Sequence, residues 1–534
     1  MQFQIKSTQK MPHLLLNAGR SWLLPSLIIG LIYVPLLLEG GIITDDWGDI
    51  LQTWNCQGFM HCYGAWFPLF SNRPLAPLPI TLSTQLFTTH YAWYLFTNTS
   101  IYIAALVLTA HAFKSMLSLR ARQIFFILAA VPCIAMPLVV SPINQLTATL
   151  AFLYWAISLI LIQKYSRTQE WFWYGLGYLS LLCGFLTYEI ILPLLFFTAF
   201  LPALENPATY VKRRSSYFFK YIAPILLVLL LVIVWQKILA PQFIEVFSRL
   251  NFNAAHVLPI LYTWVKTFAL DLPSLFLKAL AYLSFYNLLT LAIISILLVL
   301  GYREKIPARS FIFRAPFLIL SACAFLSSAL IFILSDAAAT PWGYQARGLS
   351  SAWFTLAIFI AALLQSSQAL SKTIRASCFV LALLFTCFSA LSFSIQRDKY
   401  IESWQLQLHI IHDAVSLIQT QKIGPNASII GNVPRYAPNN YNRELVFSQS
   451  WDFPAALVLY AQDQIRGGLV IDSRGKDLQN LRVDNDKASV NDQGIVDFTN
   501  LWLYDFEPKT NKGMLMRIPN PQALDELIKQ WQLK

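Results

Sequence analysis

Long apolar runs recur along most of this 534-residue chain and limit the kind of structure that it can form. A helix needs roughly 20 apolar residues to cross the hydrocarbon core of a bilayer. We therefore expect a mainly α, polytopic membrane helix bundle of about eleven spans, with a lipid bilayer as its solvent. The runs that predict these spans are 21–40, 91–113, 123–140, 146–163, 171–187, 189–204, 218–239, 277–300, 315–335, 350–368 and 376–395.

Charged residues are few and unevenly distributed. They make up 12% of the chain, against about 25% in an ordinary soluble protein. The whole chain holds 39 Lys and Arg against 27 Asp and Glu, whereas residues 396–534 hold 15 against 16. The positive excess therefore lies in the membrane part, where basic loops fix orientation. Nucleic acid is not an expected partner.

Basic clusters between the apolar runs test this topology. Short loops rich in Lys and Arg lie on the cytoplasmic side of a membrane. With the predicted number of spans, every basic cluster falls on that side. The N-terminus is then expected inside and the C-terminus outside. The clusters are Lys6/Lys10/Arg20, Lys114/Arg120/Arg122, Lys164/Arg167, Lys212/Arg213/Arg214, Arg303/Lys305/Arg309/Arg314 and Lys372/Arg375.

Residues 171–204 are the ambiguous stretch. One helix of that length would measure about 51 Å, which is too long for a single crossing. Both flanking loops are basic, so the number of crossings there must be even. We expect two short helices that meet at Thr187-Tyr188-Glu189, which puts Glu189 at the outer face.

Two domains are expected: a membrane domain of residues 1–395, with 41–90 as its first outer loop, and a soluble outer domain of residues 396–534. A second outer segment, 240–276, contains two stretches amphipathic enough to lie on the interface, Phe243–Leu250 and Ala254–Leu270. The soluble domain should be a small α/β or α+β unit that begins with a helix, Trp404–Gln421. Its strand-like runs are Ala427–Ile430, Leu445–Phe447, Leu457–Tyr460, Gly468–Ile471, Val496–Phe498 and Leu501–Tyr504.

An acidic motif, residues 44–49 (TDDWGD), directly follows the first span. Its aspartates could simply cap a helix, because Asp favours that position. Three features favour a site instead: the loop continues with many aromatic residues, it reaches residues 71–75 (SNRPL), and Glu189 and Arg347 fall on the same side. Sparse charges that converge on one face of a membrane bundle indicate a functional site.

This arrangement resembles the GT-C superfamily, multi-pass glycosyltransferases that use polyprenyl-phosphate-linked sugars. The shared features are an acidic pair after the first helix, a long first outer loop, an Arg-Pro before the second helix and a soluble outer C-terminal domain. Within the superfamily, Asp45-Asp46-Trp47 and residues 72–75 (NRPL) are most similar to bacterial O-antigen glucosyltransferases of the GtrII type. The specific motifs occupy only residues 44–75 and Tyr188-Glu189.

The resemblance implies an enzyme of the bacterial inner membrane with a periplasmic C-terminal domain. It would transfer a hexose, glucose by the nearest resemblance, from a polyprenyl-phosphate donor to a lipid-linked or surface polysaccharide. One of Asp45 and Asp46 would be the general base, since a carboxylate within reach of the acceptor hydroxyl can take its proton. Which of them acts stays open, and the other would orient the sugar or a cation. A divalent cation is left open and no cofactor is assigned, because two carboxylates alone make a weak site.

The leaving phosphate requires positive charge, and a guanidinium suits phosphate oxygens. Arg347, in residues 341–347 (PWGYQAR), and Arg73 are the two candidates, with interfacial anchoring as the alternative for each. Glu189 would bind a sugar or pair with one of these arginines. Tyr188 and Gln345 are grouped with them as substrate-binding residues.

Aromatic side chains of the outer loops could stack on sugars, although an aromatic belt is the commoner explanation. The candidates are Trp47, Trp54, Trp66 and Trp342. Cys56 and Cys62 are expected to form a local disulfide in the oxidising outer compartment. A metal site that includes the adjacent His61 fits poorly, because three ligands would be crowded into a few residues.

Two other classes of function compete with the enzyme. A transporter or flippase of polyprenyl-linked glycans would place ionisable residues near the membrane midplane. Here the span centres are nearly free of charge and the acids lie at the outer edge, which favours an enzyme. An accessory or scaffold protein would leave the acidic and aromatic loop without a role.

Overall fold

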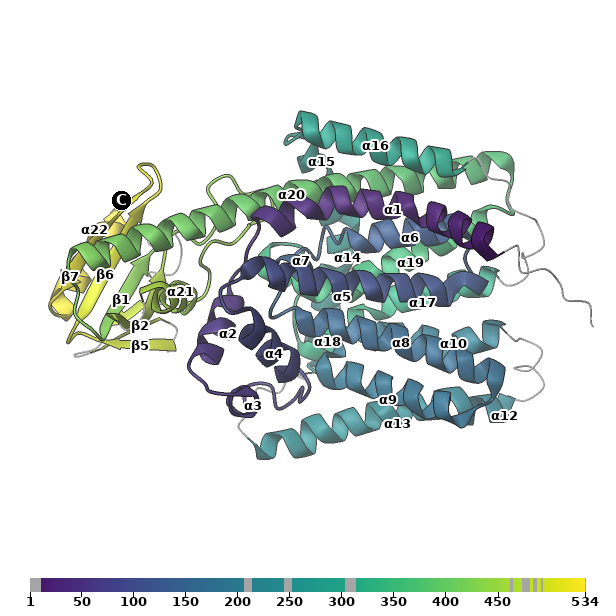
Figure 1. Cartoon of the computed structure of the whole chain (residues 1–534), viewed down its shortest axis with the longest axis horizontal. Coiled ribbons are helices and arrows are strands. Elements are labelled where there is room, and N and C mark those ends of the chain that lie inside the picture. The colour runs from purple at the N-terminus through teal and green to yellow at the C-terminus, as the bar shows by residue number, and fades with distance from the viewer. Residues whose placement is uncertain are drawn as a thin grey trace, which may run out of the picture.

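The computed structural model describes residues 11–205, 214–243, 252–302, 314–461, 464–472, 481–483, 487–490 and 493–533. Its apolar helices lie side by side in a bundle, and a smaller domain with β-sheet covers one end of that bundle (Figure 1). We call the covered end the domain end and the opposite end the basal end. The fold is the expected mainly α membrane bundle with a small C-terminal α/β domain.

Among the described residues, seven helical segments are long and apolar enough to cross a membrane. They are Tyr91–Ser115, Leu146–Thr168, Arg214–Gln242, Ala254–Leu280, Ala315–Ser335, Gly343–Ser367 and Lys372–Thr420. The number of about eleven crossings stays a prediction. Of the basic residues used to predict the topology, Lys6, Lys10, Lys212, Arg213, Arg303, Lys305 and Arg309 lie outside the described residues.

The helices of the bundle differ in length. They are α1 (Met11–Glu39), α5 (Tyr91–Ala112), α8 (Leu146–Thr168), α9 (Trp171–Thr187), α10 (Leu195–Glu205), α13 (Ala223–Val234), α16 (Phe285–Tyr302), α17 (Arg314–Ser327), α18 (Ala329–Ser335) and α19 (Ser350–Ser367). The break expected in residues 171–204 is present, because Tyr188 is extended (φ −163°, ψ 129°). A 3-10 turn, η3 (Glu189–Leu194), then leads into α10.

The span expected at 123–140 is not one helix. It consists of α6 (Leu119–Ala130) and the single turn α7 (Pro137–Val140). Pro132 and Pro137 lack the backbone N–H that a continuous helix requires. Residues 131–136 are buried, so protein surrounds this irregular backbone, as membrane depth demands. The interruption directs the following residues, Ser141–Asn144, toward the acidic motif.

The segment Ala254–Leu280 lies along the domain end of the bundle. It contains α14 (Val257–Lys266) and α15 (Leu272–Leu280). His256, at its beginning, contacts Asp336 at 2.9 Å. Near its other end the Leu275 carbonyl accepts a hydrogen bond of 2.6 Å from Tyr441 of the C-terminal domain. Both ends therefore stay at the domain end, as expected of an interfacial segment. Of the other stretch expected there, residues 244–250 lie outside the described residues.

One helix of 49 residues, α20 (Lys372–Thr420), connects the bundle to the C-terminal domain (Figure 1). The expected domain boundary at 395/396 therefore falls within a continuous helix. Asn442 of the C-terminal domain hydrogen-bonds to Gln396 and to the Pro341 carbonyl of the bundle. The two parts meet through this helix and these contacts rather than through a linker.

The C-terminal domain contains two sheets. The larger has the order β2-β1-β6-β7, formed by β1 (Ala427–Asn432), β2 (Ile465–Ile471), β6 (Leu501–Glu507) and β7 (Lys512–Ile518). β1 pairs in parallel with β2 and β6, and β7 is antiparallel to β6. The smaller antiparallel sheet has the order β3-β4-β5, formed by β3 (Leu481–Val483), β4 (Lys487–Val490) and β5 (Gln493–Asp497).

Two expected strands are absent. Leu457–Tyr460 lies in a helix, α21 (Asp452–Ala461), and Leu445–Phe447 contributes only an isolated bridge between Leu445 and Tyr436. A short apolar run does not distinguish a strand from a buried helix, so tertiary packing decided both. The strands β3, β4 and β7 and the last helix, α22 (Pro521–Leu533), were not predicted.

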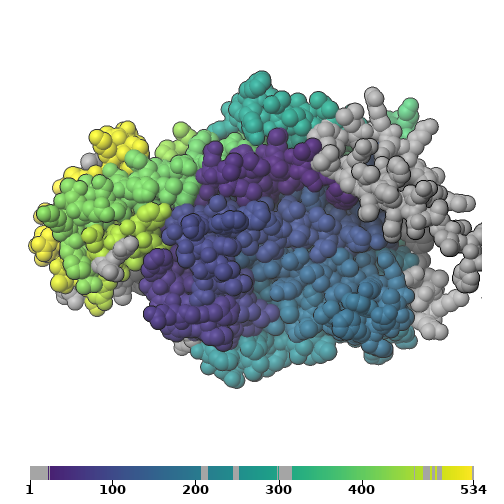
Figure 2. Space-filling view, in the orientation of Figure 1, coloured from purple at the N-terminus to yellow at the C-terminus, as the bar shows by residue number. Residues whose placement is uncertain are grey.

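The first outer loop is a helical subdomain that packs against the C-terminal domain. We call residues 41–90 the first-loop subdomain; it contains α2 (Asp45–Trp54), α3 (Phe59–Trp66) and α4 (Pro77–Phe87). One buried apolar cluster includes Trp47 and Ile50 of this subdomain, Trp404 of α20 and Phe453 of α21. Figure 2 shows the two parts in contact at the domain end. They share a hydrophobic core, and a cavity lies beside it.

Candidate functional site

The short helix α2 presents two faces with different surroundings. Residues three or four apart lie on one face of a helix. Asp46, Trp47, Ile50 and Thr53 are buried in the shared core. Asp45, Gly48, Asp49, Gln52 and Asn55 line a cavity. Adjacent aspartates of the motif therefore belong to different faces.

Asp46 lies on the buried face of α2, away from the cavity. Its carboxylate is fully buried and accepts hydrogen bonds from the Asn144 N–H (2.9 Å), the Ser141 hydroxyl (3.1 Å) and the Ile43 N–H (3.4 Å). Burial raises the pKa of Asp46 to about 7, although these three donors act in the opposite direction. Asp46 joins the first-loop subdomain to the segment after α7 and does not line the cavity. The prediction that it could be the base does not fit this placement.

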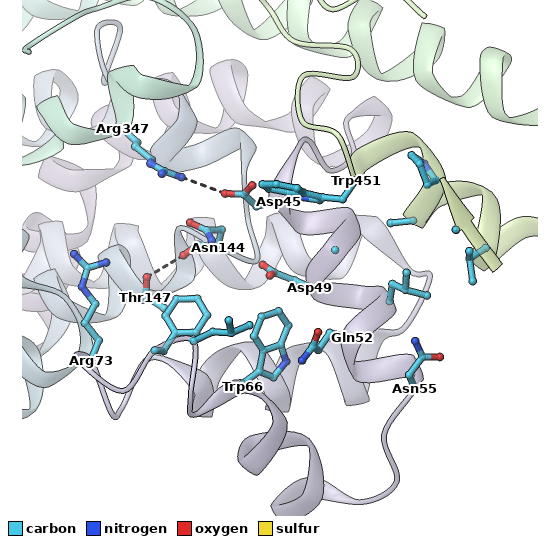
Figure 3. Close-up of a pocket in the computed structure, with 18 of the residues that line it drawn as sticks. Asp45, Asp49, Gln52, Asn55, Trp66, Arg73, Asn144, Thr147, Arg347 and Trp451 are labelled. Atoms are coloured by element: carbon cyan, nitrogen blue, oxygen red, sulfur yellow. Dashed lines mark hydrogen bonds and ion pairs between the residues drawn. The ribbon is translucent and has the colours of Figure 1, made fainter. Parts of the chain in front are cut away.

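Asp45 faces the cavity. Its Oδ2 lies 3.4 Å from Nη1 of Arg347, whose guanidinium lies 4.1 Å from the ring centroid of Tyr344 (Figure 3). The Asp45 side chain is 22% exposed, so a ligand in the cavity can reach it. A carboxylate held by one cation and open to a cavity can accept a proton from a bound hydroxyl.

Asp49 is a second carboxyl at the cavity, and the sequence did not single it out. The residue is 4% exposed, and its Oδ2 has no hydrogen-bond partner among the described residues. Burial, followed by the charges of Asp46 and Asp45, raises its pKa well above the usual value. Its spacing in the sequence could have identified it as a cavity residue, because Asp49 is four residues after Asp45 and hence on the same helical face.

The cavity beside α2, which we call the polar cavity, measures about 690 Å³. The first-loop subdomain forms one wall, and residues of α21 and β2 form another. Asn144 and Thr147 at the start of α8 close a third side. Figure 3 shows Arg73 and Arg347 at one side, Trp451 and Asn55 at the other, and Asp45 between them.

A second cavity of about 640 Å³, the apolar cavity, adjoins the first. Its walls are mainly Leu, Ile, Val and Phe side chains of α9, η3, α13 and α18. Arg73, Tyr188 and Arg347 line both cavities and so mark where they meet. Glu189 and Gln345 line only the apolar one.

The predicted pairing of Glu189 with an arginine is present. Arg73 Nε lies 2.5 Å from Glu189 Oε2, and the guanidinium lies 3.8 Å from the centroid of the Tyr188 ring. Gln236, in the segment Trp235–Leu239 that continues α13, donates a hydrogen bond to Glu189 Oε1 at 3.0 Å. Arg73 is therefore held in place by Tyr188 and Glu189, although the first-loop subdomain carries it.

The four predicted sugar-stacking tryptophans are placed differently. Trp47 is fully buried, stacks on Trp404 and donates a hydrogen bond to Gln407 at 2.9 Å, so no face of its ring is free for a sugar. Trp342 packs on the bundle core and Trp54 points to the surface, and neither lines a cavity. Trp66 reaches the polar cavity but is only 5% exposed.

Cys56 and Cys62 form a disulfide that joins the end of α2 to α3. The link fixes the turn between these helices and leaves neither thiol free to bind a metal. Among the described residues, no group of three or more His, Cys, Asp or Glu gathers as metal ligands.

No family model matches this chain, and no curated protein matches its sequence. Among solved structures, it is similar to ArnT from Cupriavidus metallidurans, bound to undecaprenyl phosphate and in the apo state. Each is 13% identical with a TM-score of 0.37, over 84% of this chain and 85% or 86% of theirs. A likeness of this size supports no statement about the activity of the present chain.

Proposed function

We propose that this protein is a membrane glycosyltransferase that moves a sugar from a polyprenyl-phosphate donor to a glycan acceptor. One observation carries the proposal: a polar and an apolar cavity meet at Arg73, Tyr188 and Arg347. A donor made of a lipid, a phosphate and a sugar matches the succession of apolar cavity, arginine side chains and polar cavity. Its first isoprene units fit the apolar cavity, its phosphate the two guanidinium groups and its sugar the polar cavity.

Asp45 is the proposed general base. Its carboxylate takes the proton of the acceptor hydroxyl, whose oxygen forms the new bond to the anomeric carbon of the sugar. The bond from that carbon to the phosphate oxygen breaks, and polyprenyl phosphate leaves with the bonding electrons. Arg347 and Arg73 offset the negative charge that develops on the phosphate. Phosphate bound to Arg347 also competes with Asp45 for the guanidinium, which frees the Asp45 carboxylate.

Glucose is the proposed sugar and a lipid-linked or surface polysaccharide the proposed acceptor. Both follow from the resemblance of the motifs around Asp45 and Arg73. The decisive measurement is consumption of polyprenyl-phosphate glucose by the purified protein in detergent, with linkage analysis of the product. A flippase would consume none, because detergent removes the two compartments between which it moves its cargo.

Asp45→Asn should lower kcat/KM for transfer about 10²- to 10⁴-fold, the usual contribution of a general base. Asp46→Asn is the matched control, because its carboxyl does not reach the cavity; transfer should fall less than about tenfold. Equal activity of the Asp45 variant and the wild type would refute the assignment of the base.

The C-terminal domain is proposed to be periplasmic in the inner membrane. The described basic residues Lys372 and Arg375 lie at the start of α20, whose other end enters the C-terminal domain. Basic ends of membrane helices face the cytoplasm. A C-terminal fusion to alkaline phosphatase should therefore be active, and a fusion to a cytoplasmic fluorescent reporter dark. The reverse pattern would invert the topology.

A further inference from the structure

We propose that the side of the polar cavity away from the two arginines is an acceptor subsite for a neutral oligosaccharide, with the indole of Trp451 as its stacking platform. The inference rests on the proposed function and names its acceptor. Trp451 precedes α21 in the C-terminal domain and is 40% exposed. It lines the same cavity as Asp45 (Figure 3).

Trp451 differs from the other tryptophans of this region. Trp47 and Trp404 stack on each other, and Trp66 lies beside Phe70. Among the described residues, the Trp451 ring has no aromatic neighbour and its indole N–H no hydrogen-bond partner. A large ring in a cavity without such contacts provides an apolar face for a ligand, and its N–H can donate to a hydroxyl.

The main chain holds Trp451 in place independently of its ring. Asp452 is fully buried, and its Oδ2 accepts the N–H groups of Ser448 (2.9 Å) and Gln449 (3.0 Å), which fixes the turn before α21. Below the ring lies Gly48, where an added Cβ would come within 3.4 Å of Trp451 Cδ1. Glycine is costly inside a helix, and a side chain at this position would contact the edge of the indole.

The chemistry of this side of the cavity fits an uncharged sugar. Gln52 and Asn55 offer amide groups, and Asp49 offers a carboxyl with an unpartnered oxygen. Among the described residues that line the cavity, Arg73 and Arg347 are the only cations, and the donor phosphate is proposed to occupy them. An acidic sugar near Trp451 would face the Asp45 carboxylate, whose partner Arg347 is proposed to bind the donor phosphate.

The length of the cavity indicates more than one sugar ring. Its lining follows α2 from Asp45 to Asn55, which corresponds to about 15 Å of helix. The ring that receives the new bond would lie at Asp45 and against Trp451. Further rings would extend along Gln52 toward Asn55, which is exposed.

Binding and transfer are measured on the purified full-length protein in detergent. The binding probes are linear trisaccharides of glucose, galactose, mannose and rhamnose, with trigalacturonic acid as the acidic comparison, each titrated by calorimetry. We expect at least one neutral trisaccharide to bind in the millimolar range and Trp451→Ala to weaken it about tenfold, a loss of about 1.4 kcal/mol. Trp451→Phe should retain most of the affinity, because it keeps an aromatic face.

Two further variants separate the subsite from loss of structure. Trp54→Ala removes an exposed tryptophan of α2 that does not line the cavity, and it should bind like the wild type. Gly48→Leu should block binding by filling the space below the indole, and leucine suits a helix. Tighter binding of trigalacturonic acid than of every neutral probe, or unchanged binding by both cavity variants, would overturn the proposal.

Transfer distinguishes this inference from the proposed function. Trp451→Ala should raise the acceptor KM about tenfold, whereas Trp54→Ala should leave it unchanged, because Trp54 does not line the cavity. If trisaccharide binds as expected but no polyprenyl-phosphate sugar is consumed, the subsite stands and the glycosyltransferase proposal fails. If transfer occurs and Trp451→Ala leaves the acceptor KM unchanged, the subsite assignment fails and the proposed function stands.

Discussion

Asp45 and Asp46 are neighbours in the sequence, yet their carboxylates have different surroundings. Successive helical residues point about 100° apart, since a turn takes 3.6 residues. The start of α2 at Asp45 therefore directs one carboxylate into the polar cavity and the other into a fully buried polar contact with Ser141 and Asn144. Thr44, immediately before them, has a positive φ of 47°. Such a conformation is costly for a β-branched residue, and the surrounding core must enforce this turn.

The buried carboxyl of Asp46 should make stability depend on pH. Its pKa in the folded protein is about 7, above the ordinary value of 3.8. A raised pKa contributes stability that is fully present below pH 4 and lost as the pH rises through about 7. Asp46→Asn lacks this titrating group. Its unfolding free energy, relative to that of the wild type, should therefore rise by roughly 2 kcal/mol between pH 5 and pH 8. Thermal unfolding of both proteins in detergent across this pH range measures the difference. Parallel plots of stability against pH would contradict the prediction.

The helix α2 joins three parts of the molecule. Its cavity face carries Asp45 and Asp49, its first turn binds the segment after α7 through Asp46, and Trp47 binds α20. The disulfide between Cys56 and Cys62 fixes its end to α3. The position of the proposed base thus depends on contacts made by residues that never touch a substrate.

Replacing Trp47 tests that dependence. Trp47→Ala would leave a cavity in the shared core and should cost about 3–5 kcal/mol, whereas Trp47→Phe keeps most of the packing and loses the bond to Gln407, about 1 kcal/mol. Limited proteolysis of the first-loop subdomain and thermal unfolding report both effects. Trp54→Ala, on the exposed side of the same helix, should stay within about 0.5 kcal/mol of the wild type. Equal losses at Trp47 and Trp54 would show that α2 is not anchored as described.

At the scale of the whole molecule, α20 determines where the C-terminal domain sits. It runs without a break from the basal end into that domain and brings α21 and β2 to the polar cavity. Residues about 400 positions apart, Asp45 and Trp451, therefore line the same space. A rigid helix suits this purpose, because a flexible linker would leave the cavity wall without a fixed position.

Inserting one alanine after Glu402, an exposed position of α20, should abolish transfer. The insertion rotates everything beyond it by about 100° and shifts it by about 1.5 Å, so the C-terminal domain can no longer meet the first-loop subdomain. The bundle should still insert into the membrane, which fluorescence size exclusion verifies. An alanine inserted in the exposed turn at Thr510-Asn511 is the control and should leave transfer intact. Activity in the α20 variant would show that the C-terminal wall is dispensable.

Patterns in the amino-acid sequence predict the membrane class, the helix break at Tyr188 and the sharing of one end by Asp45, Arg73, Glu189 and the C-terminal domain. These properties follow from constraints that act locally, namely the bilayer thickness, which fixes the length of apolar runs, and the preference of basic loops for one side. The prolines in residues 123–140 could have predicted the helix break there. They could not have predicted that Ser141 lies against Asp46.

The packing of distant segments, rather than any sequence pattern, shows which aspartate faces the cavity, that Trp47 is a core residue and that Trp451 is not. The identity of a residue does not reveal whether its side chain is buried, because burial depends on what distant segments bring against it. The face of α2 covered by α20 and α21 became core, and the face they left open became the cavity with Asp45 and Asp49. That choice depends on packing between parts of the chain hundreds of residues apart, for which no local pattern in the sequence provides a signal.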